Sequence, residues 1–292
     1  AEAVITIIES GVKNEIYNIC GGYEQSNLET VAKIITLCRH TNKAMDTEFP
    51  GTVVKPYFDS DKSQDNYFKT LRLNVNSLQL IQLGISFGHQ NHGLIRNKYC
   101  LQFNFDFDFS ENIFAQDSID LLLRSGVDFE YHKKNGISVE IFISMLISSG
   151  LIFNEKIYWI SFHSGYDFGY LVKILTKKPL PRNSIDFLKL VEFYFPNFYD
   201  VKYLNLFSGN FIGGLNKLAE KLQVDRIGKV HQAGSDSILT LSVFEKLRST
   251  YFAGTIHEKF KGILFGLNDL HSEGTECKES YTMENISNLI HR

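Results

Sequence analysis

The sequence predicts an α/β fold from two observations. Between residues 41 and about 266, short apolar runs typical of strands alternate with longer stretches whose apolar residues recur at helical spacing. The chain has 292 residues, of which 43% are hydrophobic and 13% aromatic, so it can bury a large core. No run approaches the roughly 20 apolar residues of a membrane-spanning helix, so we do not expect the chain to be a membrane protein.

Three stretches follow one another along the chain. Residues 1–40 form an atypical N-terminal segment. It has a strand-like run at 15–20, a Gly-Gly turn, and a helix predicted for about 27–38 from the capping box of Ser26 and Glu29. Residues 41–266 form the main domain, and the polar residues 267–292 predict a C-terminal tail.

Strands and helices of the main domain are predicted from how often apolar residues recur, every second residue in a strand and every three to four residues in a helix. Phe103, Phe105, Phe107 and Phe109 alternate with polar residues, which is the pattern of a half-buried strand. Strands are expected at 44–49, 79–87, 101–109 and 157–162. Helices are expected at 115–125, 139–149, 167–176, 211–222 and 235–249.

The charge of the chain is nearly balanced, with 30 Lys and Arg against 33 Asp and Glu and a formal net charge of -3. This argues against a broad basic surface for nucleic acids but leaves room for a local site. The four cysteines form no CxxC motif and predict free thiols in a reducing compartment. The first residues lack a basic region, so we expect no signal peptide and a cytoplasmic or nuclear location.

The first candidate site is the triplet Asp46-Thr47-Glu48. Residues i and i+2 of a strand point to the same face, so the two carboxylates would converge, and oxygen-rich pairs suit Mg²⁺ or Mn²⁺. Acid-x-acid pairs also occur by chance. The sequence has three others, Asp59/Asp61, Asp106/Asp108 and Asp128/Glu130. Taken alone, the triplet is therefore more simply a solvated strand face.

Two further acids lie at predicted helix starts. Asp167 follows the strand-like run 157–162 through a Ser-Gly turn, where α/β sites usually lie, although an aspartate there also commonly caps the helix. His231 lies five residues before Asp236 in a Gly-containing loop, so that imidazole and carboxylate could surround one centre. A helix cap beside a surface histidine fits that pattern equally well.

Together these motifs resemble the DEDDh exonucleases, which have an RNase H-like fold with a mixed sheet flanked by helices. The local sequences at 46–51, 162–171 and 231–237 are similar to the CAF (Pop) family of poly(A)-specific deadenylases. Further similar stretches are 81–84, 102–105, 115–119, 199–204 and 253–267. The resemblance thus runs from about residue 44 to 267.

The resemblance implies an enzyme that shortens mRNA poly(A) tails from the 3′ end and releases 5′-AMP. It also implies two partners in the carbon catabolite repressor–NOT complex, a scaffold and a second nuclease subunit. By motif, Asp46, Glu48, Asp167 and Asp236 would hold two divalent cations, Mg²⁺ or Mn²⁺, and His231 would be the general base. The physics agrees, because clustered carboxylates repel by about 4 kcal/mol per close pair at an effective dielectric near 20, and bound cations offset that repulsion.

Stacking against a terminal adenosine requires an aromatic face. Phe49 and Phe168 adjoin predicted metal ligands, and His163 and Tyr166 are equally well placed. A role in the core is open for each phenylalanine, and the sequence does not decide between the two roles.

The resemblance to the deadenylases weakens before Asp46. The polar residues 38–43 make the strand that carries Asp46 and Glu48 look short. Residues 1–38 resemble instead a piece of the dTDP-glucose 4,6-dehydratases, in the stretches 15–22 and 26–29. That piece has neither a GxGxxG loop nor a Tyr-x3-Lys pair, so we expect no NAD and set a nucleotide-sugar enzyme aside.

Two hypotheses remain. The first is an active exoribonuclease that acts on the 3′ end of poly(A) RNA. The second is a deadenylase fold with weak or no catalysis, compromised in its first strand, that serves as a protein-protein interaction module. Convergence of the four carboxylates beside His231 in the folded chain would favour the first.

Overall fold

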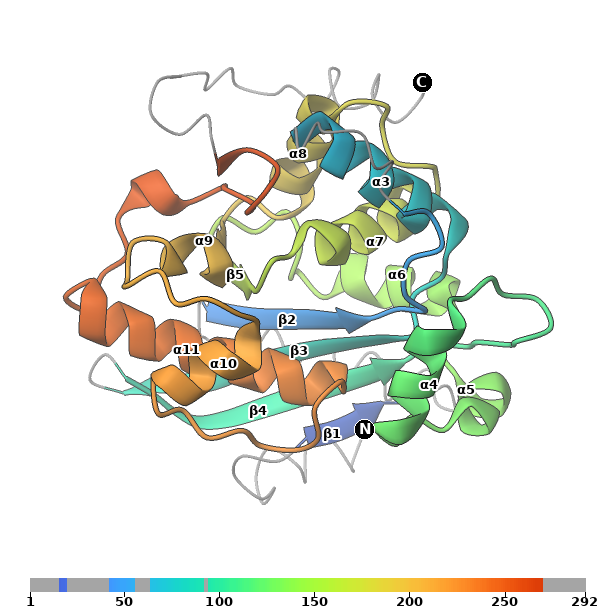
Figure 1. Ribbon diagram of the computed structural model, residues 1–292, viewed down its shortest axis with the longest axis horizontal. Helices are drawn as coiled ribbons and strands as arrows, with labels where there is room; N and C mark the ends of the chain where they lie inside the picture. Colours follow the sequence, from blue (N-terminus) through green and yellow to red (C-terminus); the bar gives the residue numbers. More distant parts are fainter. Residues whose placement is uncertain (1–15, 20–41, 56–63, 92–93, 270–292) are drawn as a thin grey trace.

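The computed structural model describes residues 16–19, 42–55, 64–91 and 94–269. Within these residues, one mixed sheet of six strands has the order β1-β4-β3-β2-β5-β6 (Figure 1). The strands are β1 (Ile16–Ile19), β2 (Asn42–Glu48), β3 (Gln82–Asn91), β4 (Leu94–Asn104), β5 (Tyr158–Ser161) and β6 (Phe198–Asp200). β2, β3 and β4 are antiparallel neighbours, whereas β5 and β6 continue in parallel from β2, and β1 is parallel to β4.

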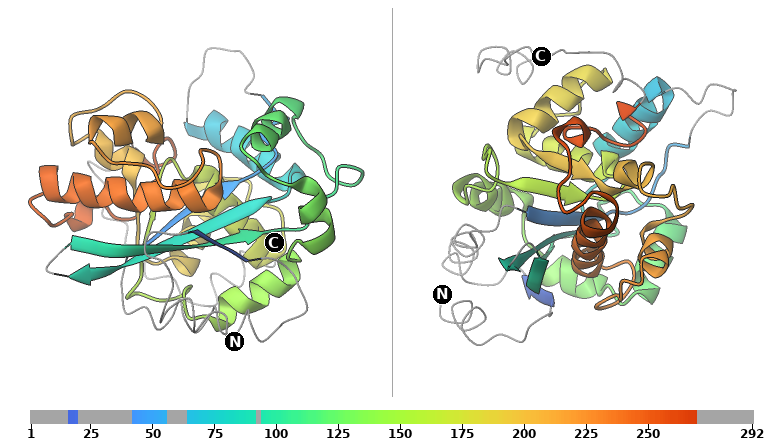
Figure 2. Two further views of the ribbon diagram at one scale, coloured as in Figure 1. Left: turned by 90° about the horizontal axis from the view of Figure 1, so that it is seen from below. Right: turned by 90° about the vertical axis from the view of Figure 1, so that its left-hand side faces the viewer.

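Helices cover both faces of this sheet. α11 (Ala233–Tyr251) runs across one face over β2, β3 and β4 (Figure 1). On the other face, one apolar core joins the sheet to α3 (Gln64–Ser77), α6 (Val139–Ser148), α7 (Gly165–Thr176) and α8 (Ser184–Tyr194). Figure 2 shows these layers from two further sides. The remaining helical elements are α4 (Gln116–Arg124), α5 (Phe129–Asn135), α9 (Val201–Asn205), α10 (Leu215–Lys221) and the 3₁₀ turn η1 (Glu258–Phe260).

The alternation of side chains along β2 decides which layer each of its residues meets. Ala44 belongs to the core under α11, whereas Met45 belongs to the core under α3 and α7. Because successive side chains of a strand point to opposite faces, Asp46 and Glu48 lie on the α11 side. Thr47 lies on the α7 side. The end of β2 is therefore reached by side chains from both layers.

The nine strands and helices predicted in the main domain are all present within the described residues, with shifted ends. The largest shift is in β4, which begins at Leu94 and not at 101, and ends at Asn104 and not at 109. Phe105 makes a single bridge to Ile137, Phe107 packs into a cluster with Ile119 and other residues, and Phe109 is 40% exposed. The alternation of aromatic residues thus continues after the hydrogen-bonded strand has ended, because another apolar cluster receives them.

The sequence pattern did not predict α3, α5, α8, α9 or β6. In α3, Phe68, Leu71 and Val75 are buried at helical spacing, but polar residues fill most of the helix. One of these, Asn74, is buried as well, and its side-chain oxygen accepts the backbone N–H groups of the loop at 53–54. A buried polar side chain weakens the apolar stripe on which sequence prediction relies.

The strand that the sequence indicates as short and polar is a regular one. β2 has seven residues and pairs with β3 on one side and β5 on the other. Lys43 is fully buried, with its ammonium 5.6 Å from the ring centre of Phe87. A cation over an aromatic face is stabilised even inside the protein, so the polar residues at the start of β2 do not disrupt the strand.

Part of the N-terminal segment also contributes to the sheet. The strand predicted at 15–20 is confirmed as β1, in which Ile16 pairs with Cys100 of β4. The helix predicted for 27–38 and residues 270–292 of the tail lie outside the described residues, and the predicted division of the chain at residue 40 stays a prediction. In the part of the chain that is described, no helix has the length and apolar composition needed to cross a membrane.

Candidate active site

Four carboxylates meet at the end of β2. Asp46 and Glu48 are on β2, Asp167 is in the first turn of α7, and Asp236 is in the first turn of α11. Burial raises the pKa of Asp46 well above its ordinary value, and the charges of the other three carboxylates raise it further. Burial, followed by the charges of Asp236 and Asp167, raises the pKa of Glu48 in the same way. The structure therefore brings the four predicted carboxylates together.

A close approach between β3 and α11 makes this meeting possible. Gly84 is the register partner of Asp46. A Cβ atom on Gly84 would lie 2.1 Å from the carbonyl oxygen of Ala233, the first residue of α11. Only a glycine leaves room for the helix to begin directly on the strand, which places Asp236 beside Asp46.

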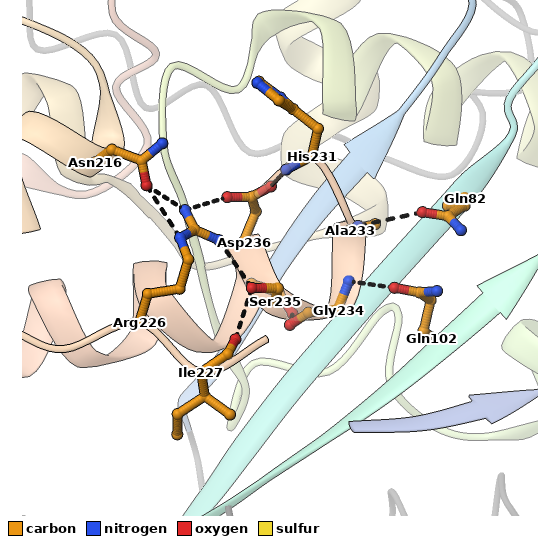
Figure 3. A network of polar contacts seen from close by, with 11 residues as sticks. Gln82, Gln102, Asn216, Arg226, Ile227, His231, Ala233, Gly234, Ser235 and Asp236 are labelled. Carbon is orange, nitrogen blue, oxygen red and sulfur yellow. Dashed lines mark hydrogen bonds and ion pairs between the residues drawn. The ribbon is translucent and has the colours of Figure 1, made fainter. Parts of the chain in front are cut away.

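Side-chain amides from the sheet hold the first turn of α11. The Oε1 atom of Gln102 accepts the N–H of Gly234 at 2.9 Å, and the Oε1 atom of Gln82 accepts the N–H of Ala233 at 3.3 Å (Figure 3). The amide nitrogens of both glutamines donate to the Oδ1 atom of Asn104. The unpaired N–H groups at a helix start need such acceptors, so the sheet fixes the position from which Asp236 extends.

Asp236 turns back over the start of its own helix. One oxygen, Oδ2, accepts the backbone N–H of His231 at 3.0 Å, and Oδ1 accepts from the Nη2 atom of Arg226 at 2.6 Å (Figure 3). Gln232, not Asp236, is at the N-cap position of the helix. His231 has a left-handed backbone with φ 58°, a conformation that is uncommon outside glycine and concentrated at functional sites.

Asp167 has a different environment. The hydroxyl of Thr47, on β2, donates to its Oδ1 atom at 2.6 Å. Burial raises the pKa of Asp167 to about 6, although the hydrogen bonds from Thr47 and from its own backbone oppose that shift. Ser164 is at the N-cap position of α7. The sequence left open whether Asp167 caps its helix, and the structure turns it toward the carboxylate cluster instead.

The cluster suits hard divalent cations. Carboxylate oxygens are the donors that Mg²⁺ and Mn²⁺ prefer. Glu48, His231 and Asp236 each offer a ligand atom, and these atoms lie within 4.8 Å of one another. Without cations, burial and then the neighbouring like charges raise the pKa of Asp46 and Glu48, which is the electrostatic signature of a site built for positive charge.

The other acid-x-acid pairs do not join this cluster. Asp108 is near the surface and forms an ion pair with Lys133 at 2.9 Å. Asp128 caps α5 by accepting the N–H of Tyr131. The pair at 59 and 61 lies outside the described residues. Among the described pairs, only Asp46 and Glu48 meet acids from two helices, so the solvated-face interpretation of this triplet is wrong.

The three aromatic candidates for substrate binding have different positions. Phe168 is fully buried against Phe195 and Phe198, so the structure assigns it the core role that the sequence left open and removes it as a stacking residue. Phe49 is half-buried and stacks on Tyr166, with ring centres 5.2 Å apart.

His163 is half-buried, and its ring stacks at 6.1 Å on Tyr67. Burial and the nearby Lys202 lower the pKa of His163 to about 4. The ring is therefore neutral at neutral pH and can offer a flat face or a hydrogen bond, but not a charge for a phosphate.

Sequence reasoning missed the residues that hold the site together. These are Thr47, Gly84, Arg226 and the glutamines Gln82 and Gln102. Thr47 occupies the unspecified position between two predicted ligands, and Gly84 carries no periodic signal. Each acts on a residue distant in the sequence or across a loop. Gln82, Gly84 and Gln102 lie in the stretches 81–84 and 102–105 that resemble the deadenylase family, but those stretches did not indicate what the three residues contact.

Residues 25–140 match the model of the CAF1 family ribonucleases. The chain is 47% identical over 230 residues to the probable CCR4-associated factor 1 homolog 7 of Arabidopsis thaliana, with 77% of this chain and 83% of that protein covered. It is 40% identical over 263 residues to the poly(A) ribonuclease pop2 of Schizosaccharomyces pombe, with 90% and 78% covered.

Solved structures agree with these sequence matches. The structure of S. pombe Pop2p in its Mg²⁺- and Mn²⁺-bound form has a TM-score of 0.78 and 40% identity, with 86% of this chain and 99% of that chain covered. The yeast CAF1 crystallised with the NOT1 MIF4G domain has a TM-score of 0.68 and 29% identity, with 87% and 97% covered. The predicted RNase H-like mixed sheet flanked by helices is confirmed. By sequence and by fold, the chain belongs to the CAF1 family of ribonucleases.

Proposed function

We propose that this chain is a metal-dependent 3′–5′ exoribonuclease that shortens poly(A) tails and releases 5′-AMP. The observation that carries the proposal is the convergence of Asp46, Glu48, Asp167 and Asp236 beside His231. The name of the S. pombe relative, poly(A) ribonuclease pop2, supports the substrate. The regular β2 strand removes the reason for expecting a compromised site.

The chain's own residues have separate tasks in this proposal. The four carboxylates would hold two divalent cations, and Thr47 orients Asp167 among them. When bound, such cations would supply Lewis-acid chemistry for the attacking water and the scissile phosphate. His231 accepts the proton of the attacking water, since imidazole is the side chain that most often serves as a general base.

The terminal adenosine needs a flat partner beside the cluster. Phe49 directly follows Glu48, and it is half-buried and backed by Tyr166 and Tyr170. That backing would keep its ring in a fixed orientation, so Phe49 is our first choice for stacking. His163 is the second.

We also propose that the chain docks on the scaffold of a deadenylase complex. The support is the relative that was crystallised with the NOT1 MIF4G domain and the description of the Arabidopsis relatives as CCR4-associated factors. In that complex, a second nuclease subunit would be a further partner, and both cytoplasm and nucleus are suitable locations.

The test is digestion of 5′-labelled oligo(A) with Mg²⁺ or Mn²⁺, with oligo(U) as the competing substrate. We expect a ladder of products shortened from the 3′ end, mononucleotide 5′-AMP, and no reaction in EDTA. Asp46→Asn should abolish the reaction. Asp108→Asn, in an acid-x-acid pair that forms a surface ion pair, is the matched control and should be fully active.

The same preparation separates the two hypotheses. An active enzyme gains thermal stability from Mn²⁺ and loses that gain in Asp46→Asn. If folded wild-type protein with metal leaves oligo(A) intact, yet binds a NOT1 MIF4G domain in a pull-down, the interaction-module hypothesis replaces our proposal.

A further inference from the structure

Arg226 contacts the carboxylate cluster from the loop between α10 and α11. Its Nη2 atom lies 2.6 Å from the Oδ1 atom of Asp236, and its Nη1 atom donates to the hydroxyl of Ser235 at 2.8 Å. Its Nε atom donates to the side-chain oxygen of Asn216 at 3.1 Å (Figure 3). The side chains of Arg226 and Asp236 are only 15% and 12% exposed. The guanidinium is therefore a fixed part of the site and not a loose surface charge.

The charge of Arg226 reaches beyond its direct partner. Arg226 lowers the pKa of Asp46 and of Glu48, against the larger effects of burial and the neighbouring carboxylates. Four acids and this one guanidinium thus share a buried space. Because an ion pair with low exposure is weakly screened, the guanidinium offsets part of the repulsion that the acids would otherwise suffer.

Arg226 also occupies one of the two oxygens that Asp236 could offer to a cation. Both oxygens of Asp236 are engaged, Oδ1 by Arg226 and Oδ2 by the N–H of His231. Asp236 lies in the group of ligand atoms that it forms with Glu48 and His231. A divalent ion that binds through Oδ1 must share or displace the contact with the guanidinium, and one that binds through Oδ2 still lies on a carboxylate that the guanidinium contacts.

We propose that Arg226 is a built-in counter-cation of the cluster, which supports the fold of the metal-free protein and weakens its affinity for divalent cations. The inference rests on the proposed function only in taking the cluster as the metal site. Asn216 and Ser235 anchor the guanidinium, and Arg226 positions Asp236. It is a positioning residue, since it reaches the cation only through Asp236 and through its charge.

Calorimetric titration of the full chain with MnCl₂ at neutral pH tests this role directly. Arg226→Gln removes the charge and keeps a hydrogen-bonding side chain. We expect its Kd for Mn²⁺ to be about tenfold lower than that of wild type, because a unit charge this close to a divalent ion is a strong repulsion even at high effective dielectric. In EDTA, the same variant should melt at a lower temperature than wild type. Arg226→Lys, which keeps the charge, should bind Mn²⁺ within about threefold of wild type.

Asn216 offers a second test that leaves Arg226 itself in place. Asn216 is exposed and accepts from the guanidinium. Asn216→Asp draws the guanidinium away from Asp236 and should tighten Mn²⁺ binding by about threefold. Asn216→Ala removes the anchor without adding charge and should change the Kd by less than twofold. These variants decide the question even if Arg226→Gln does not fold in EDTA.

Weaker or unchanged Mn²⁺ binding by both Arg226→Gln and Asn216→Asp overturns the proposal, because Arg226 would then only orient a ligand. Failure of the proposed function has a different result. In that case wild type binds no Mn²⁺, or Asp46→Asn binds it as tightly as wild type does.

Discussion

The two helices that complete the cluster reach it from opposite faces of the sheet and neutralise their aspartates differently. Asp167, from α7, is buried and receives the neutral hydroxyl of Thr47, and its pKa is raised to about 6. Asp236, from α11, receives the charged guanidinium of Arg226 and a backbone N–H. On the α7 side, burial favours the neutral form of Asp167, whereas on the α11 side the guanidinium of Arg226 balances the charge of Asp236. Positive charge from the protein enters the described cluster from one layer only.

Because the two sides differ, one cluster can be stable without metal and still bind divalent cations. A cluster neutralised on both sides would bind metal weakly, and one neutralised on neither side would strain the fold. On the α7 side, Asp167 receives only a neutral donor, so a bound cation would be stabilised there. The α11 side keeps the empty cluster in place. Four experiments test this difference between the two sides of the cluster, and the first should have the strongest effect.

Neutralising either aspartate should lower activity by at least about a hundredfold, since both are predicted metal ligands. The stability of the metal-free protein should separate them. In EDTA, Asp167→Asn should melt about 2–3 °C higher than wild type, because it removes a buried charge without a cation partner. Asp236→Asn should melt about 2–3 °C lower, because the guanidinium loses the carboxylate with which it forms an ion pair. Shifts of the same sign in thermal melts would contradict the comparison.

Gly84→Ala should damage the α11 side alone. Its Cβ would collide with the carbonyl of Ala233, so the helix start and Asp236 must move away from β2. We expect a loss of about 1–3 kcal/mol in the free energy of unfolding and a melting temperature lower by about 3–8 °C. Activity should fall by about tenfold or more, because small displacements of catalytic groups are costly.

Gly214→Ala is the matched control for that substitution. Gly214 is near the start of α10, and a Cβ there meets nothing within 4 Å. It should leave activity and melting temperature nearly unchanged. If both alanine variants behave alike, the close approach at Gly84 does not matter to the site.

The pH dependence of stability should reveal the unpaired charge of Asp167. Its pKa is raised from 3.8 to about 6 in the folded chain, so its stabilising protonated form is fully present below pH 4 and lost as the pH rises through 6. In EDTA, Asp167→Asn should therefore match wild type near pH 4 and exceed its melting temperature increasingly toward pH 7.5. With Mn²⁺, wild type should instead melt higher than Asp167→Asn as the pH rises, because cations bind the deprotonated carboxylates. A difference that does not change with pH would contradict the burial effect.

Thr47→Val should produce the smallest change. It keeps the shape of the side chain and removes the hydroxyl that donates to Asp167. We expect a loss of about 1 kcal/mol at pH 7.5 without metal, or about 2–3 °C in a thermal melt, and less at pH 5, where Asp167 is protonated. Thr70→Val, whose hydroxyl donates to a carbonyl within α3, is the control. An equal loss of stability at both pH values would mean that the hydrogen bond from Thr47 does not specifically stabilise the charged form of Asp167.

Much of the fold and of the cluster could be predicted from particular local patterns. The alternating phenylalanines predicted β4, and the helical spacing predicted α11 and α7. The pattern did not predict where β4 ends, because Phe105 and Phe107 stay buried after the hydrogen-bonded strand stops. It did not predict α3, whose buried Asn74 serves a distant loop. In both cases a neighbour far along the chain decides the local structure.

Motif spacing and side-chain period are local properties, so the order of amino acids is enough to show which residue types can form the cluster and where they occur along the chain. Which of these acids join the cluster depends on tertiary contacts. Asp46 and Asp108 both belong to acid-x-acid pairs, yet one joins the cluster and the other pairs with a surface lysine. The deciding contacts join Thr47 to Asp167, 120 residues apart, and Gly84 to Ala233 across two layers. Burial and charge pairing arise only when the chain has closed such distances, so they leave no trace in local sequence.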